Sequence, residues 1–475
     1  MKTINIYKTV LLLFGFLAIF SCEKRLEVVP EDNVASNTVF GSLPTINGAV
    51  VGIYSKNQSG DLNGMAQFMS DFWSDNVNFV GSFPTLQEID QYITIATNTS
   101  IDNIWLDGYE LIGAANNIIV NLPEVSVDEV VGLTEADKEV FVGEAKFLRA
   151  LTYFQLVNLF AQPYQVSDGT NLGVPIVTIP FEGGAITEFQ LERSTVNEVH
   201  SFIEQDLLDA IAALPEENGV RAEAGAARAL LARLYLYREN WGPAANLADQ
   251  VISSAQYSLA PDYNFYDNNP GSPENIFSVV NTPSDGPQEN GGGSDEVYTT
   301  FYNPAPGGRG DGPFSQDLLD AYAVEPGDLR FTSLSAPAQD AQGNDTFFTT
   351  KYPDIVNNSS DGMVLRVTEM YLIRAEANFR GGTSIGDTPL NDINTLRSRA
   401  DLEDLGSLDL DAILLERRKE LAFEGHRRMD LLRNNLNLRP DGAAVSAPGA
   451  DRVIFPIVDD EINNNPNITQ NPGNF

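Results

Sequence analysis

The chain contains very little cysteine and histidine. Among its 475 residues, Cys22 is the single cysteine, and His200 and His426 are the only histidines. One cysteine cannot form an internal disulfide, and two histidines leave little room for a zinc site or a Ser-His-Asp relay. No GxxxxGK, GxGxxG or CxxC pattern is present. We therefore expect no metal site, no cofactor and no nucleophilic relay of this kind, although the sequence does not decide whether a calcium ion binds.

Basic side chains are also scarce. The chain has 29 Lys and Arg against 66 Asp and Glu, which gives a formal net charge of −37 at pH 7. A field of this sign repels nucleic acids and anionic lipids, so DNA and RNA are excluded as partners. It also weighs against polyanionic polymers such as sulfated glycans. With 43 % hydrophobic and 20 % charged residues, the composition is that of a globular protein and not of a disordered acidic chain.

The N-terminal apolar run is short. It extends from Val10 to Phe20 behind Lys2 and Lys8, whereas a membrane-spanning helix needs roughly 20 apolar residues. A basic N-terminal region, an apolar stretch and a small residue before the cleavage site are typical of a secretory signal peptide, which we predict at residues 1–21. Cys22 follows directly, as in a lipobox, and is the predicted lipid attachment site. The alternative is a soluble periplasmic protein with an incidental cysteine.

Most of the remaining chain has the period of amphipathic helices. Apolar residues recur at i, i+3, i+4 and i+7 in eight segments, with Asp102 and Thr195 as predicted N-caps and with Pro163 and Pro215 ending two helices. These segments are 101–122, 136–161, 195–214, 223–238, 243–255, 367–380, 389–400 and 409–434.

Two pairs of these segments resemble helical hairpins. In residues 225–255, Ala232, Tyr235 and Ala244 have the small-aromatic-small spacing of a tetratricopeptide hairpin. Residues 367–400 form a second predicted hairpin. The fold class expected is therefore mostly α, a tetratricopeptide-like helical hairpin solenoid with a long irregular loop and short-strand insertion.

One C-terminal segment concentrates the scarce basic residues. Residues 416–433 hold seven basic side chains, counting His426, and Glu416, Glu420 and Glu424 recur every four residues. A continuous helix would place these carboxylates on one face. A metal site or a general acid/base pair is one interpretation of this pattern. A structural ion-pair lattice is the interpretation we favour, because each carboxylate has a basic residue within four positions.

The same segment is similar to the SusD/RagB family of outer-membrane glycan-binding lipoproteins. Further similarity lies in the helices at 143–154 and 366–377 and in the closing Phe455-Pro456-Ile457 to Gln470-Asn471-Pro472-Gly473 tail. Val458 departs from the usual proline. The likeness is weak in residues 77–95 and 283–350.

This resemblance implies a function and a domain organisation. It implies a non-catalytic cell-surface protein, lipid-anchored in the outer membrane, that captures an oligosaccharide or polysaccharide and delivers it to a SusC-like TonB-dependent transporter. The expected organisation is a signal peptide (1–21), an N-terminal anchor and helical region (22–264), an irregular subdomain (265–365) and C-terminal helices with the tail (366–475).

The two windows of weak similarity are the expected glycan site. Both are rich in Gly, Pro, Asn and Asp and read as loops and short strands that carry aromatic rings. Sugars stack their C–H faces on rings and need polar partners for their hydroxyls, and in the SusD/RagB family these two regions contact the glycan. The candidate residues are Asp75, Asn78, Phe83, Tyr92, Tyr298, Tyr302, Phe314 and Arg330. The alternative for each ring is a small core beneath a long loop.

Two other functional classes remain open from the sequence. The helical repeats are compatible with a structural or adhesive surface protein that contacts only other proteins. A surface glycoside hydrolase is the third hypothesis, because 66 acidic residues offer many carboxylate pairs, although none stands in a recognisable strand-end setting. Glycan binding without release of reducing ends separates the first hypothesis from the third.

Overall fold

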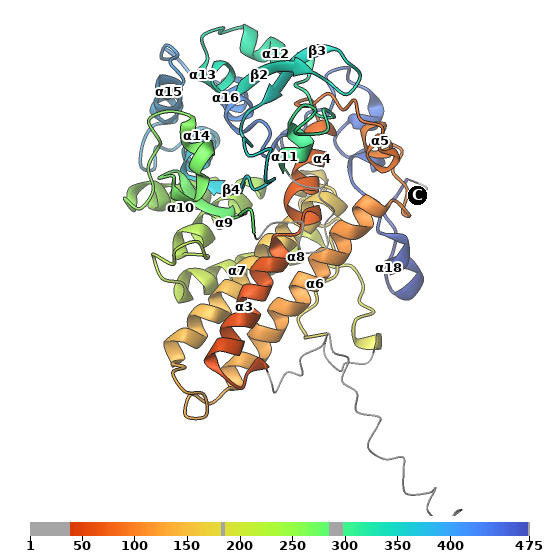
Figure 1. Ribbon diagram of the computed structural model, residues 1–475, viewed down its shortest axis with the longest axis vertical. Helices are drawn as coiled ribbons and strands as arrows, with labels where there is room; N and C mark the ends of the chain where they lie inside the picture. The colour runs from red at the N-terminus through yellow and green to blue at the C-terminus, as the bar shows by residue number, and fades with distance from the viewer. Residues whose placement is uncertain (1–38, 182–185, 285–297, 474–475) are drawn as a thin grey trace, which may run out of the picture.

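The computed structural model describes residues 39–181, 186–284 and 298–473, and most of these residues are helical (Figure 1). The first helices are α3 (Leu43–Asn57), α4 (Ala66–Phe72), α5 (Pro84–Asp90), α6 (Thr99–Asn121), α7 (Glu135–Phe160), α8 (Val196–Ala213), α9 (Ala224–Tyr237) and α10 (Trp241–Ser253). They are followed by α11 (Tyr298–Tyr302), α12 (Gln316–Ala323), α13 (Leu329–Thr332), α14 (Val367–Gly381), α15 (Pro389–Arg399), α16 (Leu410–Leu421), α17 (Arg427–Arg433) and α18 (Asp459–Asn464). The strands are β1 (Asn275–Val279), β2 (Ser335–Gln339), β3 (Asp345–Thr349) and β4 (Gly362–Arg366).

Long helices form the N-terminal half. Helix α3 packs on α6 and α7, α6 packs on α7, and α7 packs on α8, and Figure 1 shows α3, α6 and α7 running side by side in the lower half of the molecule. Helix α8 begins with a capping box in which Thr195 and Glu198 satisfy each other's backbone N–H groups, which confirms the predicted cap. The predicted cap Asp102 is wrong, because Asn98 caps α6 one turn earlier.

Helical hairpins continue the scaffold. Helices α9 and α10 pack against each other, α10 packs on α14, and α14 packs on α15. Ala232 and Ala244 are fully buried between the first pair, as their small size predicts. The second hairpin turns at Gly382, whose φ of 63° lies in the left-handed region that glycine adopts readily. The predicted mostly helical, hairpin-based fold is confirmed.

Short elements occupy the irregular insertion. Strand β1 pairs antiparallel with β4, and β2 pairs antiparallel with β3. The insertion also contains the short helices α11, α12 and α13, and the window at 77–95 contains α5, where loops and short strands were expected. One or two turns do not reveal a 3.6-residue period, so the sequence pattern missed these helices.

The predicted helix at 409–434 is broken. Helix α16 ends at Leu421 and α17 starts at Arg427, with Phe423 at φ 67° and Gly425 at φ 77° between them. A Cβ at Gly425 would lie 3.0 Å from the backbone of Gln67, so glycine also permits a close approach to α4. Glu424 therefore does not share a helix face with Glu416 and Glu420.

One large hydrophobic core joins the helices to the insertion. It includes Trp73 and Trp105 of the N-terminal half as well as Phe301 and Tyr352 of the insertion. Trp241 is half-buried against the Arg380 guanidinium. In the described ranges, no helix combines the length and the apolar character that crossing a membrane requires.

Candidate functional site

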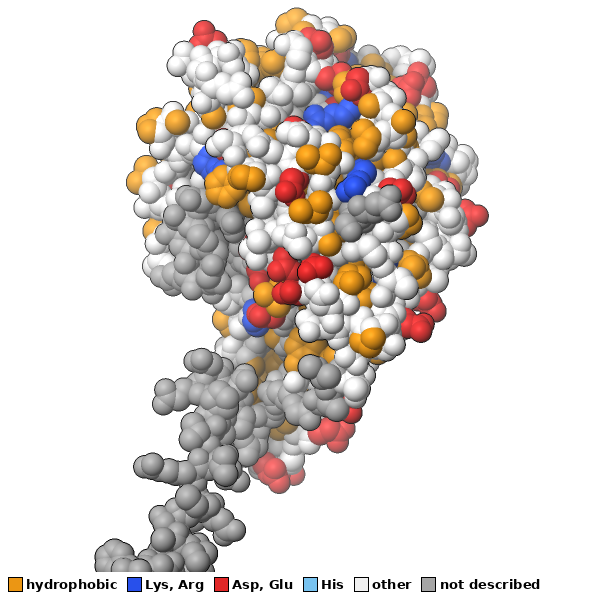
Figure 2. Space-filling view, turned by 90° about the vertical axis from the view of Figure 1, so that its right-hand side faces the viewer, with side chains coloured by type: hydrophobic (Ala, Val, Ile, Leu, Met, Phe, Trp, Pro, Cys, Tyr) orange, Lys and Arg blue, Asp and Glu red, His pale blue; other side chains and the backbone are white. Residues whose placement is uncertain are grey.

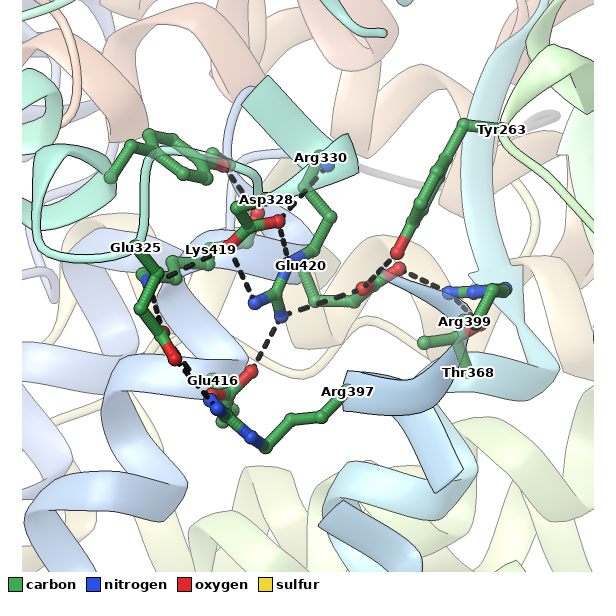
Figure 3. Close-up of polar contacts among 12 residues, drawn as sticks. Tyr263, Glu325, Asp328, Arg330, Thr368, Arg397, Arg399, Glu416, Lys419 and Glu420 are labelled. Atoms are coloured by element: carbon green, nitrogen blue, oxygen red, sulfur yellow. Dashed lines mark hydrogen bonds and ion pairs between the residues drawn. The ribbon is translucent and has the colours of Figure 1, made fainter. Parts of the chain in front are cut away.

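The basic C-terminal segment forms a buried ion-pair lattice. The Arg330 guanidinium lies between Asp328 at 2.7 Å and Glu416 at 2.6 Å, and Glu416 also pairs with Arg397 at 2.5 Å (Figure 3). The partners of Glu416 thus come from the insertion and from α15, whereas Asp430 pairs within the segment with Arg417 and Arg433. The prediction of an ion-pair lattice is confirmed, with different pairings.

Glu420 and Glu424 are the centre of this lattice. Glu420 contacts Arg399 at 2.5 Å and Arg366 at 3.0 Å, and Glu424 contacts Lys351 at 2.6 Å. Burial raises the pKa of both carboxyl groups, but the surrounding cations outweigh it and hold each pKa at about 2. These carboxylates are ionised and fully matched, so they are structural groups and not a general acid/base pair.

Three predicted ring contacts lie inside the core. Tyr298, Tyr302 and Phe314 are 2 %, 0 % and 3 % exposed. Tyr298 and Tyr302 stack on the two sides of a shared neighbour, Tyr352, and the Tyr302 hydroxyl donates to Asp71 at 2.7 Å. Phe314 packs against Phe423. These rings have no open face for a sugar, because the insertion folds back over its own aromatic residues.

Three further candidates are also buried and engaged. Asp75 accepts two hydrogen bonds from Arg427, at 2.6 and 2.8 Å. The Tyr92 hydroxyl donates to the Trp73 carbonyl at 2.7 Å. Arg330 is 3 % exposed, and its guanidinium donates hydrogen bonds to Glu416 and Asp328 of the ion-pair lattice. None of the three presents a free polar group to a ligand in this structure.

Asn78 and Phe83 are the two candidates that reach solvent, and both lie where the two sequence windows meet. Residue Val77 bridges to Phe314, and the Asn78 amide N–H donates to the Pro313 carbonyl at 3.0 Å. The Val80 N–H donates to the Asp311 carbonyl at 2.9 Å. The structure therefore brings residues 77–83 and 309–314 together into one surface.

Phe83 is the exposed ring of this surface. Its side chain is 44 % exposed, and the Arg309 guanidinium lies 4.1 Å from the ring centroid. Asp311 holds that guanidinium through a 2.7 Å hydrogen bond from Nε. A Cβ at Gly81 would lie 2.7 Å from the Asp311 carboxyl carbon, so this glycine lets the two chains approach closely.

Gln342 completes the surface from the β2–β3 turn. Its side-chain amide donates to the Val80 carbonyl at 3.4 Å, and the residue is exposed. We define the loop surface as Asn78, Phe83, Arg309, Asp311 and Gln342. The sequence pattern did not indicate Arg309, Asp311 or Gln342 as site residues. The Arg309-Gly310-Asp311 triplet was the available signal, but only the fold places it beside Phe83.

The loop surface has the chemistry of a shallow polar site. It offers one exposed aromatic ring and two exposed amides on a backbone held by cross-window hydrogen bonds, and the largely buried Arg309–Asp311 ion pair lies against the ring. On the face that Figure 2 shows, acidic side chains are scattered over the surface and basic ones are few. Cys22, the predicted lipid attachment site, lies outside the described residues.

Comparison with known proteins identifies the family. A family model described as "Starch-binding associating with outer membrane" matches residues 25–236, and the model "SusD family" matches residues 342–473. SusD-like protein P25 of Formosa agariphila is 27 % identical over 505 residues, covering 91 % of this chain and 90 % of that protein.

Solved structures share the fold. A SusD superfamily protein of Bacteroides thetaiotaomicron has 26 % identity and a TM-score of 0.81, covering 91 % of this chain and 100 % of its own. A laminarin-binding SusD-like protein has 25 % identity and a TM-score of 0.72, covering 90 % and 98 %. Since SusD models match both ends of the chain and the helical architecture is that of SusD-superfamily structures, the protein belongs to the SusD family.

Proposed function

We propose that this chain is a non-catalytic, cell-surface glycan-binding lipoprotein that captures an oligosaccharide or polysaccharide on the loop surface. The observation that carries the proposal is the exposed Phe83 ring, flanked by Arg309 and Asp311 on rigidly paired backbone. The relatives support it, since one neighbour is described as laminarin-binding and a family model as starch-binding.

The loop surface suits a neutral glycan. The Phe83 ring offers a stacking face for sugar C–H groups, while the exposed Asn78 and Gln342 amides offer partners for hydroxyls. Arg309 is already paired with Asp311, so the surface carries no unmatched positive charge for a polyanion. The overall charge of −37 opposes acidic polymers in the same way.

A direct experiment separates the three functional classes. The purified protein is run in affinity gels containing laminarin, starch, xylan, mannan or fructan, and each mixture is assayed for new reducing ends. Retardation by a neutral glycan without reducing ends supports the proposal. Reducing-end release would establish a hydrolase, and the absence of retardation by every glycan would favour a protein-binding surface protein.

Membrane attachment and delivery belong to the same proposal. Acylation at Cys22 would anchor the protein in the outer membrane, next to a SusC-like TonB-dependent transporter that receives the glycan. We expect Cys22→Ser to release the protein into the soluble fraction, because stable anchoring needs acyl chains and the acidic body has no electrostatic affinity for lipid. Fractionation after a high-salt wash measures this. A variant that stays in the membrane fraction would contradict the anchoring mechanism.

A further inference from the structure

A pocket separate from the loop surface lies where the helical scaffold meets the C-terminal segment. Its cavity volume is about 100 Å³, and its walls come from α4, α7, α9, β4 and the chain around Gly425. It has no residue in common with the loop surface. Gln67 and Asn158 on its wall are only half-buried, so the cavity communicates with solvent.

Unpartnered polar groups converge on this pocket. Among the described residues, no hydrogen-bond partner is found for the Tyr237 hydroxyl, the Asn158 side-chain amide or the His426 Nε2 atom. Tyr237 and His426 are 4 % and 8 % exposed. No protein group occupies these hydrogen-bonding positions in the described part of the chain, so water or a ligand hydroxyl in the cavity can take them.

The His426 ring is a hydrogen-bond donor in this pocket. Arg417 Nη2 lies 3.4 Å from His426 Nδ1, and a guanidinium can only donate, which places the imidazole proton on Nε2. Burial lowers the pKa of His426 to about 4, so the ring is neutral at pH 7.

Arg233, on the same wall, is matched by Glu369 at 2.5 Å. Arg428 also lines the pocket and donates to the backbone carbonyls of Asn158 and Val453, while its buried Nε has no hydrogen-bond partner among the described residues. The wall therefore combines neutral polar groups with one guanidinium that has no carboxylate partner within the described ranges.

Apolar side chains complete the wall. Leu151, Phe154, Met363 and Met429 line the cavity together with the polar groups. A cavity of about 100 Å³ has room for several waters, since about 10–15 Å³ of this kind of volume holds one. This is too small for an oligosaccharide, but it suits a few hydroxyls attached to one apolar ring face.

We propose that this pocket binds a single sugar ring or a polyol of similar size, as a second ligand site on the helical side of the protein. Ligand hydroxyls take the place of water at Tyr237, His426 and Asn158, and the C–H face lies on Phe154 and Met429. The site is independent of the loop surface, so either can fail without the other.

The test combines crystallography with calorimetry. Crystals grown without polyols are soaked in glucose, xylose or glycerol, and the same compounds are titrated into the protein in solution. We expect one ring or polyol in the pocket. Tyr237→Phe removes only a hydroxyl and is expected to weaken binding about five-fold, the effect of one neutral hydrogen bond. Asn158→Leu fills the mouth and is expected to weaken binding at least about ten-fold.

Matched controls make the result decisive. Tyr235→Phe makes the same chemical change on the same helix, but its hydroxyl donates to Glu204 outside the pocket, so affinity is expected to stay unchanged. Phe83→Ala is likewise expected to leave polyol binding intact. Melting temperatures identify any variant that is simply unfolded. Soaked crystals whose pocket holds only water, or wild-type affinity in both pocket variants, would overturn the proposal.

Discussion

Asp71 is a buried carboxyl group that makes no ion pair with any described residue. It accepts hydrogen bonds from Tyr302 at 2.7 Å and from Asn76 at 3.3 Å, and so links α4 to the start of the insertion. Burial raises its pKa from 3.8 to about 7 despite these hydrogen bonds. Below about pH 7 the folded protein therefore holds this side chain mainly in the protonated form.

The raised pKa predicts a pH dependence of stability. A group with a raised pKa in the folded state contributes stability that is complete below its unfolded pKa and is lost as the pH rises through about 7. Wild type should lose this contribution as the pH rises from about 4 to about 8, whereas the Asp71→Asn variant has no carboxyl group to titrate. The difference in unfolding free energy should therefore shift in favour of the variant by up to about 4 kcal/mol over this range. Urea denaturation at several pH values measures this difference. A difference that is constant with pH would contradict the assignment.

Glu420 is a buried carboxyl group whose pKa is lowered by surrounding cations, and it provides a second test at the residue scale. Removing its carboxylate in Glu420→Ala leaves Arg399 and Arg366 buried without their shared partner. We expect a loss of about 3–5 kcal/mol in unfolding free energy, with glycan binding kept by the folded fraction. Glu403→Ala, at an exposed position, is the control and should change little. Lost binding with unchanged stability would show that this segment is a ligand site.

At the scale of elements, the turn between α16 and α17 positions the lattice. Gly425 has a φ of 77° and packs directly on the Gln67 backbone. We expect Gly425→Ala to lower the unfolding free energy by about 1–3 kcal/mol, because the left-handed backbone is strained for alanine and the new Cβ meets α4. Thermal denaturation measures the effect.

Gly442 separates the effect of backbone strain from the effect of the contact with α4. Gly442 has a φ of 68°, but a Cβ there meets nothing within 4 Å. Gly442→Ala therefore reports the backbone term alone, and Gly425→Ala should cost more. Equal effects in the two variants would mean that the contact with α4 contributes nothing.

The sequence pattern predicted most of the long helices and both hairpins, but it missed α3 at Leu43–Asn57. Periodicity located α6 to α10, α14 and α15 within two residues at each end, because each presents several turns with one buried face. It missed the break after Leu421, since Phe423 at φ 67° gives no local signal of a left-handed turn. Glycine at 425 was the only local indication.

The sequence indicated two windows as the glycan site, and that assignment stays a prediction. The structure brings the two windows together, but composition does not distinguish an exposed Phe83 from a buried Tyr302. Burial of the insertion's rings depends on long-range stacking, such as that of Tyr302 on Tyr352. The cation–π contact between Arg309 and Phe83 joins residues far apart in the chain, so no sequence spacing encodes it.

At the scale of the whole molecule, buried ion pairs hold the insertion on the helical scaffold. Arg330 and Lys351 of the insertion reach Glu416 and Glu424 of the C-terminal segment. Asp311 and Gln342 extend from this anchored unit toward residues 77–83. The loop surface is therefore carried by a rigid body, which reduces the entropy lost when a glycan binds.

The most direct test of the account is the affinity of Phe83→Ala for the glycan that the wild-type protein binds. Phe379, which is also partly exposed at 38 % but lies on α14, supplies the control variant Phe379→Ala. Ring stacking contributes about 1–3 kcal/mol by analogy with aromatic platforms for bases, so calorimetry should show at least a roughly five-fold loss for Phe83→Ala and none for Phe379→Ala. Wild-type affinity in Phe83→Ala would contradict the claim that the loop surface captures the glycan.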